Sequence, residues 1–135
     1  MKRLFLCEQL LECISDFSNE EFQQRVWIRG EGLEVSSFRE SLCCLDDYKF
    51  QLFIDKQMLN YGFSEKLQYV LREFNCILEK FIKKMDIQAS DMSIVDNCNW
   101  SKVVDSASRA YDLFKHEIEF LKDKLDQEIA HEDFI

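Results

Sequence analysis

Residues 100–125 read WSKVVDSASRAYDLFKHEIEFLKDKL, and this stretch decides the fold. Its apolar side chains recur at alternating spacings of 3 and 4 residues. They are Val104, Ala107, Tyr111, Phe114, Ile118, Leu121 and Leu125. Such spacing places side chains along one face of an α-helix. The stretch therefore predicts one long helix over 100–130 with a continuous apolar seam.

A second apolar stripe comes before it and follows the 3.6-residue period of a helix. Its members are Leu67, Val70, Leu71, Phe74, Leu78, Phe81, Ile82 and Met85. Ser64 is a suitable N-cap for this helix, and Gly62 is a suitable stop for the element before it. The two stripes predict a long antiparallel helix pair, 64–85 with 100–130. Residues 86–98 form the connection and have room for a short helical turn.

The rest of the chain also favours helices. The 135 residues include no proline and only three glycines, the residues that end helices and fill the turns of all-β folds. We expect a first helix over 3–15 and further short helices up to residue 63. Their predicted starts are the capping boxes Ser18–Glu21 and Ser37–Glu40 and the cap Asp47. The sequence thus predicts one all-α domain over 1–135, a bundle of five or six helices.

The formal charge of −9 limits the partners. Nucleic acids and anionic membranes carry dense negative charge, so both are disfavoured. A basic protein is favoured, because opposite fields speed encounter.

Six cysteines occur without any C-x-x-C spacing, so no zinc site and no metal or cofactor is predicted. They are Cys7, Cys13, Cys43, Cys44, Cys76 and Cys98. We expect free, buried thiols in a reducing cytosol, with a disulfide or a metal role as the alternative. The N-terminal apolar run is short and is interrupted by Glu8 and Glu12, so we expect a soluble cytoplasmic protein without a signal peptide.

Two catalytic chemistries are candidates, and neither leads us to predict a catalytic residue. A nucleophilic cysteine would need a base, and the chain has two histidines, His116 and His131. Arg109 and His116, seven residues apart, share one helix face and resemble the R-x4–6-H motif of HEPN domains. That resemblance implies a helical RNase in which the polar pair acts on a phosphodiester, usually in a dimer. A solvated helix face is the favoured explanation for the two residues, because both lie off the apolar seam, where solvated polar side chains belong.

Acidic side chains lie in or beside predicted loops and form the candidate binding surface. They are Glu31, Glu34, Asp46 and Asp47. Their spacing fits no EF-hand loop. Solubility is one explanation for them, and a surface for a basic partner is the other.

Residues 22–38, FQQRVWIRGEGLEVSSF, followed by CCLDDY at 43–48, resemble small bacterial immunity proteins. These neutralise the toxin domains of contact-dependent inhibition and related polymorphic toxin systems. The resemblance implies an acidic, cytoplasmic protein that masks the active site of a basic nuclease toxin. The sequence therefore predicts a non-enzymatic inhibitor, a monomer or weak homodimer. The alternative is a HEPN-like RNase, or an inactive relative of one, using Arg109 and His116.

Overall fold

The computed structural model describes residues 4–32 and 36–132, with side chains described up to residue 126. This part of the chain is all-helical and contains no strand, as the sequence predicts. It holds seven α-helices, slightly more than the five or six expected, because three of them are only three to five residues long. The helices are α1 (Phe5–Ser18), α2 (Glu20–Phe22), α3 (Phe38–Asp47), α4 (Phe50–Leu52), α5 (Glu65–Lys84), α6 (Asp91–Val95) and α7 (Trp100–Glu132).

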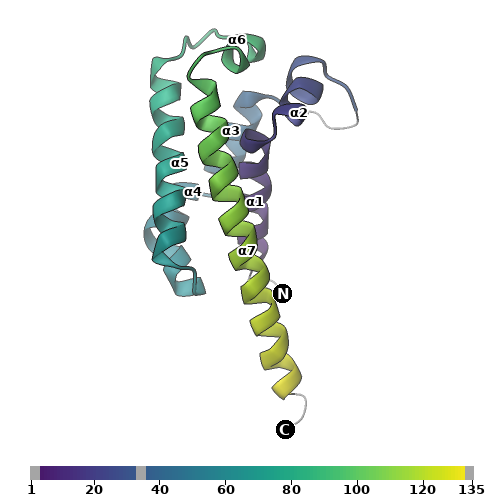
Figure 1. The fold of residues 1–135 in the computed structure, drawn as a ribbon, viewed down its shortest axis with the longest axis vertical. Coiled ribbons are helices and arrows are strands. Elements are labelled where there is room, and N and C mark those ends of the chain that lie inside the picture. The colour runs from purple at the N-terminus through teal and green to yellow at the C-terminus, as the bar shows by residue number, and fades with distance from the viewer. Residues whose placement is uncertain (1–3, 33–35, 133–135) are drawn as a thin grey trace.

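The helices α1, α5 and α7 run along the long axis of the molecule (Figure 1). α7 packs against both α1 and α5, and α3 packs against α1. The chain leaves α5 at the end of the molecule that carries α6 and returns from there along α7, whose last turns extend past the other helices (Figure 1). α7 is therefore the central helix, with partners on two sides.

The stripe that decides the fold lies in the core of the structure. Its members Val104, Ala107, Phe114 and Ile118 are buried, and Tyr111, Leu121 and Leu125 are half-buried. Val103, Ser106 and Ala110 are also buried, although they lie beside the predicted seam. The buried arc of α7 is wider than one seam because α1 and α5 both pack against it.

The start of α5 is fixed by the predicted cap. Leu67 N–H donates to Ser64 Oγ at 3.0 Å. The carboxylate of Glu117 in α7 accepts from Ser64 N–H at 2.9 Å and from Ser64 Oγ at 2.6 Å. Gly62, at φ 101°, ends the preceding helical turn in the left-handed conformation that glycine adopts at low cost. The same side chain contacts therefore start α5 and tie it to α7.

Two predicted caps are wrong, and a third is confirmed. Ser37 accepts from Glu40 N–H and caps α3 as expected. Ser18 instead lies inside α1, which extends three residues past the predicted end, and its hydroxyl donates to Ser15 O. Asn19 takes the cap position and accepts from Phe22 N–H. Asp47 caps no helix, because it is the last residue of α3 and the chain turns at Lys49, with φ 53°.

Two turns of π-helix, which the sequence does not predict, interrupt the shorter helices. They are η2 (Gln23–Ile28) and η3 (Phe53–Gln57), and a 3-10 turn, η4 (Met58–Tyr61), follows the second. In η2 the side chain of Gln23 is fully buried and all of its polar atoms have partners. Its Nε2 donates to Asp16 O at 2.9 Å and to Phe17 O at 3.1 Å, and its Oε1 accepts from Trp100 Nε1 at 2.9 Å. One glutamine thus joins the end of α1 to the start of α7.

Aromatic rings fill the core in two groups. The group at the α6 end comprises Trp27, Phe38, Phe81 and Trp100. The group towards the other end comprises Phe53, Tyr61, Phe63 and Phe114. Phe17 and Phe74 lie between them, with ring centroids 5.8 Å apart. These edge-on and tilted contacts add to the stabilisation that comes from buried area.

Candidate functional site

The acidic residues selected from the sequence lie on two parts of the surface. Glu31 lies in the loop after η2, and Asp46 and Asp47 lie in the last turn of α3; all three are exposed. Glu34 lies outside the described residues. Glu31 is 3.6 Å from the side chain of Arg29, which is also exposed.

Contacts with α1 show that these two parts are separate. Tyr48, directly after Asp47, donates from its hydroxyl to Gln9 in the middle of α1. Gln23, at the start of η2, donates to Phe17 O in the last turn of α1, and Glu31 N–H donates to Arg25 O of the same η2 turn. Residues 9 and 17 are eight positions apart, which is about 12 Å along a helix. The structure therefore places Asp46 and Asp47 together and does not place Glu31 beside them.

Helix stability does not account for Asp46 and Asp47. The C-terminal end of a helix carries partial negative charge, so carboxylates are disfavoured there. Both side chains are nevertheless exposed in the last turn of α3.

Residues 12–47, which we call the acidic segment, present carboxylates over most of their length. The exposed ones in its described part are Glu12, Glu20, Glu21, Glu31, Glu40, Asp46 and Asp47. Two exposed cations of this segment are already engaged. Arg29 faces Glu31, and Arg39 donates to the carbonyl oxygens of Ile87 and Ala89, both at 2.9 Å. Residues 12–47 hold nine carboxyls and three arginines, so the acidic segment keeps a net negative charge even with Arg29 beside Glu31.

One carboxyl of this segment is turned inward, which the sequence did not reveal. Asp16 Oδ2 accepts from Ser41 Oγ at 3.0 Å between α1 and α3. Burial raises the pKa of Asp16 to about 6, although the hydrogen bond from Ser41 opposes that rise. Asp16 therefore joins two helices and lies too deep to be part of an exposed charged surface.

The expectation of buried cysteines holds for only part of the set. Cys7 and Cys13 are buried and Cys44 is partly buried, whereas Cys43, Cys76 and Cys98 are exposed. Cys43 lies on the outward face of α3, Cys76 on the outward face of α5, and Cys98 in the loop before α7. Burial raises the pKa of the Cys7 thiol to about 12, and burial together with Cys44 does the same for Cys13. Both buried sulfurs are therefore thiols at neutral pH, and a thiol is a poor nucleophile.

Arg109 and His116 share one face of α7, as their spacing predicts. Both are exposed, and both line a shallow groove between α5 and α7, together with Lys66, Asp112 and two apolar residues. Arg109 Nη2 lies 3.0 Å from Glu73 Oε1 of α5. The structure thus brings the two residues to one groove and gives the guanidinium a carboxylate partner there.

Within the part of the chain that the structure describes, no three His, Cys, Asp or Glu side chains are grouped closely enough to hold a metal ion. Among the same residues, no helix has the length and apolar character needed to cross a membrane.

Comparisons with protein-family models, with curated proteins and with solved structures gave no match for this chain.

Proposed function

We propose that the chain is an immunity protein that binds a basic nuclease toxin domain and masks its active site. The proposal includes stoichiometric binding without catalysis, action in the cytoplasm, and a monomer or weak homodimer. We also propose that α5 and α7 act as a long antiparallel pair, the rigid frame on which the shorter helices are presented.

The observation that carries the proposal is the exposure of carboxylates along the acidic segment. A partner of opposite charge would meet this segment at a higher rate. Many exposed carboxylates therefore favour a basic protein as the partner and disfavour a nucleic acid. Asp46 and Asp47 are the strongest candidates for contact, because they are adjacent, exposed and disfavoured at a helix end. Glu31 and Glu34 are proposed as the second part of the same interface.

The proposal predicts that a basic nuclease toxin domain is encoded beside the gene, and the test measures binding to a catalytically inactive form of that domain. Asp46→Lys/Asp47→Lys is expected to slow association about tenfold or more at low salt, and association of the native chain should slow steeply as salt rises. Asp123→Lys/Asp126→Lys makes the same charge change at exposed positions of α7 and serves as the matched control. Its association rate should stay within about threefold of the native value.

Cell survival gives the second measurement. Cells that express the active toxin should be protected by the native chain and by the α7 control variant, and less well by the α3 variant. Absence of binding between the native chain and the toxin would reject the proposal. Equal losses in the two charge-reversal variants would place the interface outside α3.

A HEPN-like RNase is the second candidate, and one observation favours it: Arg109, His116 and Lys66 line the same groove. RNA cleavage by the purified chain, abolished by either Arg109→Ala or His116→Ala, would support it over the immunity proposal. The contact of Arg109 with Glu73 weighs against it, since a guanidinium that must bind phosphate would first have to leave that carboxylate. Cleavage that survives both substitutions would reject this candidate.

A further inference from the structure

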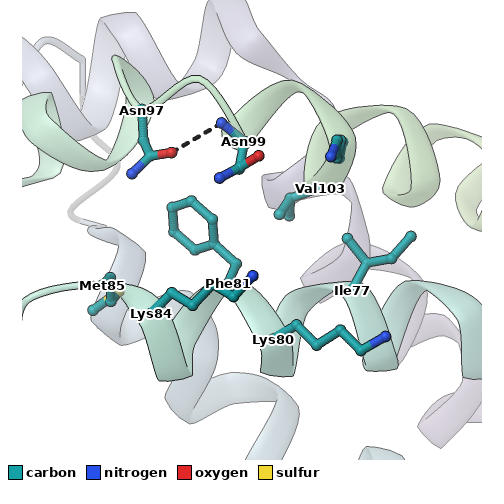
Figure 2. Close-up of a pocket in the computed structure, with 9 residues that line it drawn as sticks. Ile77, Lys80, Phe81, Lys84, Met85, Asn97, Asn99 and Val103 are labelled. Atoms are coloured by element: carbon teal, nitrogen blue, oxygen red, sulfur yellow. Dashed lines mark hydrogen bonds between the residues drawn. The ribbon is translucent and has the colours of Figure 1, made fainter.

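A hollow lies between the end of α5 and the start of α7. None of its lining residues belongs to the acidic segment or to the groove that holds Arg109 and His116. Its volume is about 160 Å³. It is lined by Ile77, Lys80, Phe81, Lys84, Met85, Asn97, Asn99, Lys102 and Val103. Figure 2 shows the ring of Phe81 reaching from α5 towards Asn97 and Asn99 on the opposite wall.

The charge of this hollow is opposite to that of the whole chain. Three lysines and two asparagines line it, and no carboxylate is among the lining residues. The chain as a whole carries a formal charge of −9. The floor is apolar, because Ile77, Phe81, Met85 and Val103 are among the residues that line the hollow.

Helix stability accounts for only part of this basic group. Lys80 and Lys84 lie near the C-terminal end of α5, where cations are favoured by the helix dipole. Lys102 lies in the first turn of α7, where a cation is disfavoured, and that turn contains no acidic residue. A bound anion would be attracted both by Lys102 and by the positive end of this 33-residue helix.

Asn97 adds a donor of fixed direction. Asn97 Oδ1 accepts from Asn99 N–H at 2.9 Å, so the remaining polar end of the Asn97 amide is its NH2 group. An amide NH2 group donates hydrogen bonds and suits an anionic oxygen. Lysine ammonium groups, on flexible four-carbon stems, also bind phosphate as mobile point charges.

We propose that this hollow binds a phosphate monoester carried on a single flat apolar ring. Three ammonium groups favour a phosphate monoester, with about −1.5 to −2 charges at pH 7, over a carboxylate with one. A cavity of roughly 150 Å³ accommodates one benzene ring. The hollow has about that volume, 160 Å³, and Phe81, Ile77 and Val103 give it an apolar floor for such a ring. The site is independent of the immunity proposal, because it uses residues of α5, α7 and the loop between them.

The test titrates the full chain with phenyl phosphate by calorimetry at low salt. We expect one site with a Kd on the order of 1 mM, the range for a ligand of about eleven non-hydrogen atoms. Lys84→Gln/Lys102→Gln should weaken binding by about tenfold or more. Lys83→Gln/Lys115→Gln is the matched control, since it removes the same charge from exposed lysines of α5 and α7 that do not line the hollow.

Two further probes separate the parts of the proposal. Benzoate should bind several-fold more weakly than phenyl phosphate because it has less charge, and benzyl alcohol should not bind measurably. The proposal is overturned if phenyl phosphate does not bind, if benzyl alcohol binds as tightly, or if the control variant loses as much affinity as Lys84→Gln/Lys102→Gln.

Asn99→Asp decides the question should the double lysine variant unfold. Aspartate is a good residue directly before a helix, so this change should preserve α7. Its negative charge at the wall of the hollow should weaken phenyl phosphate binding at least about fivefold. Native affinity in a folded Asn99→Asp variant would overturn the proposal.

Discussion

Replacement of Gln23 by leucine tests whether one buried side chain holds the end of α1 against the start of α7. The native side chain is fully buried and satisfies Asp16 O, Phe17 O and Trp100 Nε1. Leucine has a similar volume and a good helix propensity, so the change removes hydrogen bonds with little change of shape. After the change, the side chain of residue 23 would offer these three atoms no hydrogen-bond donor or acceptor.

The expected cost follows from the burial of those partners. The bonds to Phe17 O and from Trp100 Nε1 are buried, whereas the bond to Asp16 O is only partly buried, so water can replace it. A buried polar group left without a partner costs about 1–3 kcal/mol. Gln23→Leu should therefore lower the free energy of unfolding by about 2–6 kcal/mol.

Urea denaturation followed by circular dichroism measures this difference. Gln24→Leu changes the exposed neighbour in the same way and should stay within about 0.5 kcal/mol of the native value. Trp100→Phe removes the indole N–H, so it should cost less in the Gln23→Leu background than in the native chain, with a coupling of about 1 kcal/mol or more. A loss below about 1 kcal/mol for Gln23→Leu, or additive effects in the double mutant, would refute this account.

Phe74→Ala and Phe114→Ala should each lower the free energy of unfolding by about 3–5 kcal/mol, since both rings are fully buried; a change below about 0.5 kcal/mol in urea would contradict the core described here. Asp16→Asn should stabilise the chain at about pH 7.5 and not at about pH 4, as two denaturation curves would show. Burial raises the pKa of Asp16 to about 6, so the folded state disfavours the ionised form and the cost grows as pH rises from about 4 to 6. A thiol reagent should modify the exposed cysteines of the native chain quickly and the buried ones only in denaturant, and uniform reactivity would show that the helices open readily. The exposed set is Cys43, Cys76 and Cys98, and the buried set is Cys7 and Cys13.

The helices themselves could be predicted because their signals are local. The stripe of α7 and the caps Ser37 and Ser64 depend on spacing and on side chains three residues apart, and the structure confirms them. The two π-helical turns could not be predicted, because their hydrogen bonds differ from an α-helix by one residue and no residue type specifies them. The turn at Lys49 was missed for a related reason: lysine rarely adopts positive φ, so its residue type gives no sign of the turn.

The sites were less predictable than the helices, because a site depends on residues distant in sequence. The hollow between α5 and α7 is lined by Lys80 and Lys84 from α5 and by Lys102 from α7, on the far side of the segment that contains α6. In the sequence the two lysines near the end of α5 suggest only a favourable interaction with the helix dipole. The signal that was overlooked is Lys102. A cation at the start of a long helix is unusual, and beside Lys80 and Lys84 it indicates a site for an anion.

Both tryptophans belong to one aromatic group, and this has a consequence for optical measurements. Trp27 and Trp100 have ring centroids 6.0 Å apart, at the end of the molecule that carries α6. Tyr61 lies in the other group, against Phe53 and Phe63. Indole fluorescence therefore reports only on the first end, and a change confined to the second would leave it nearly silent. Indole emission and the far-ultraviolet circular dichroism of all the helices, if they change at different urea concentrations, would show that the two ends unfold as separate units.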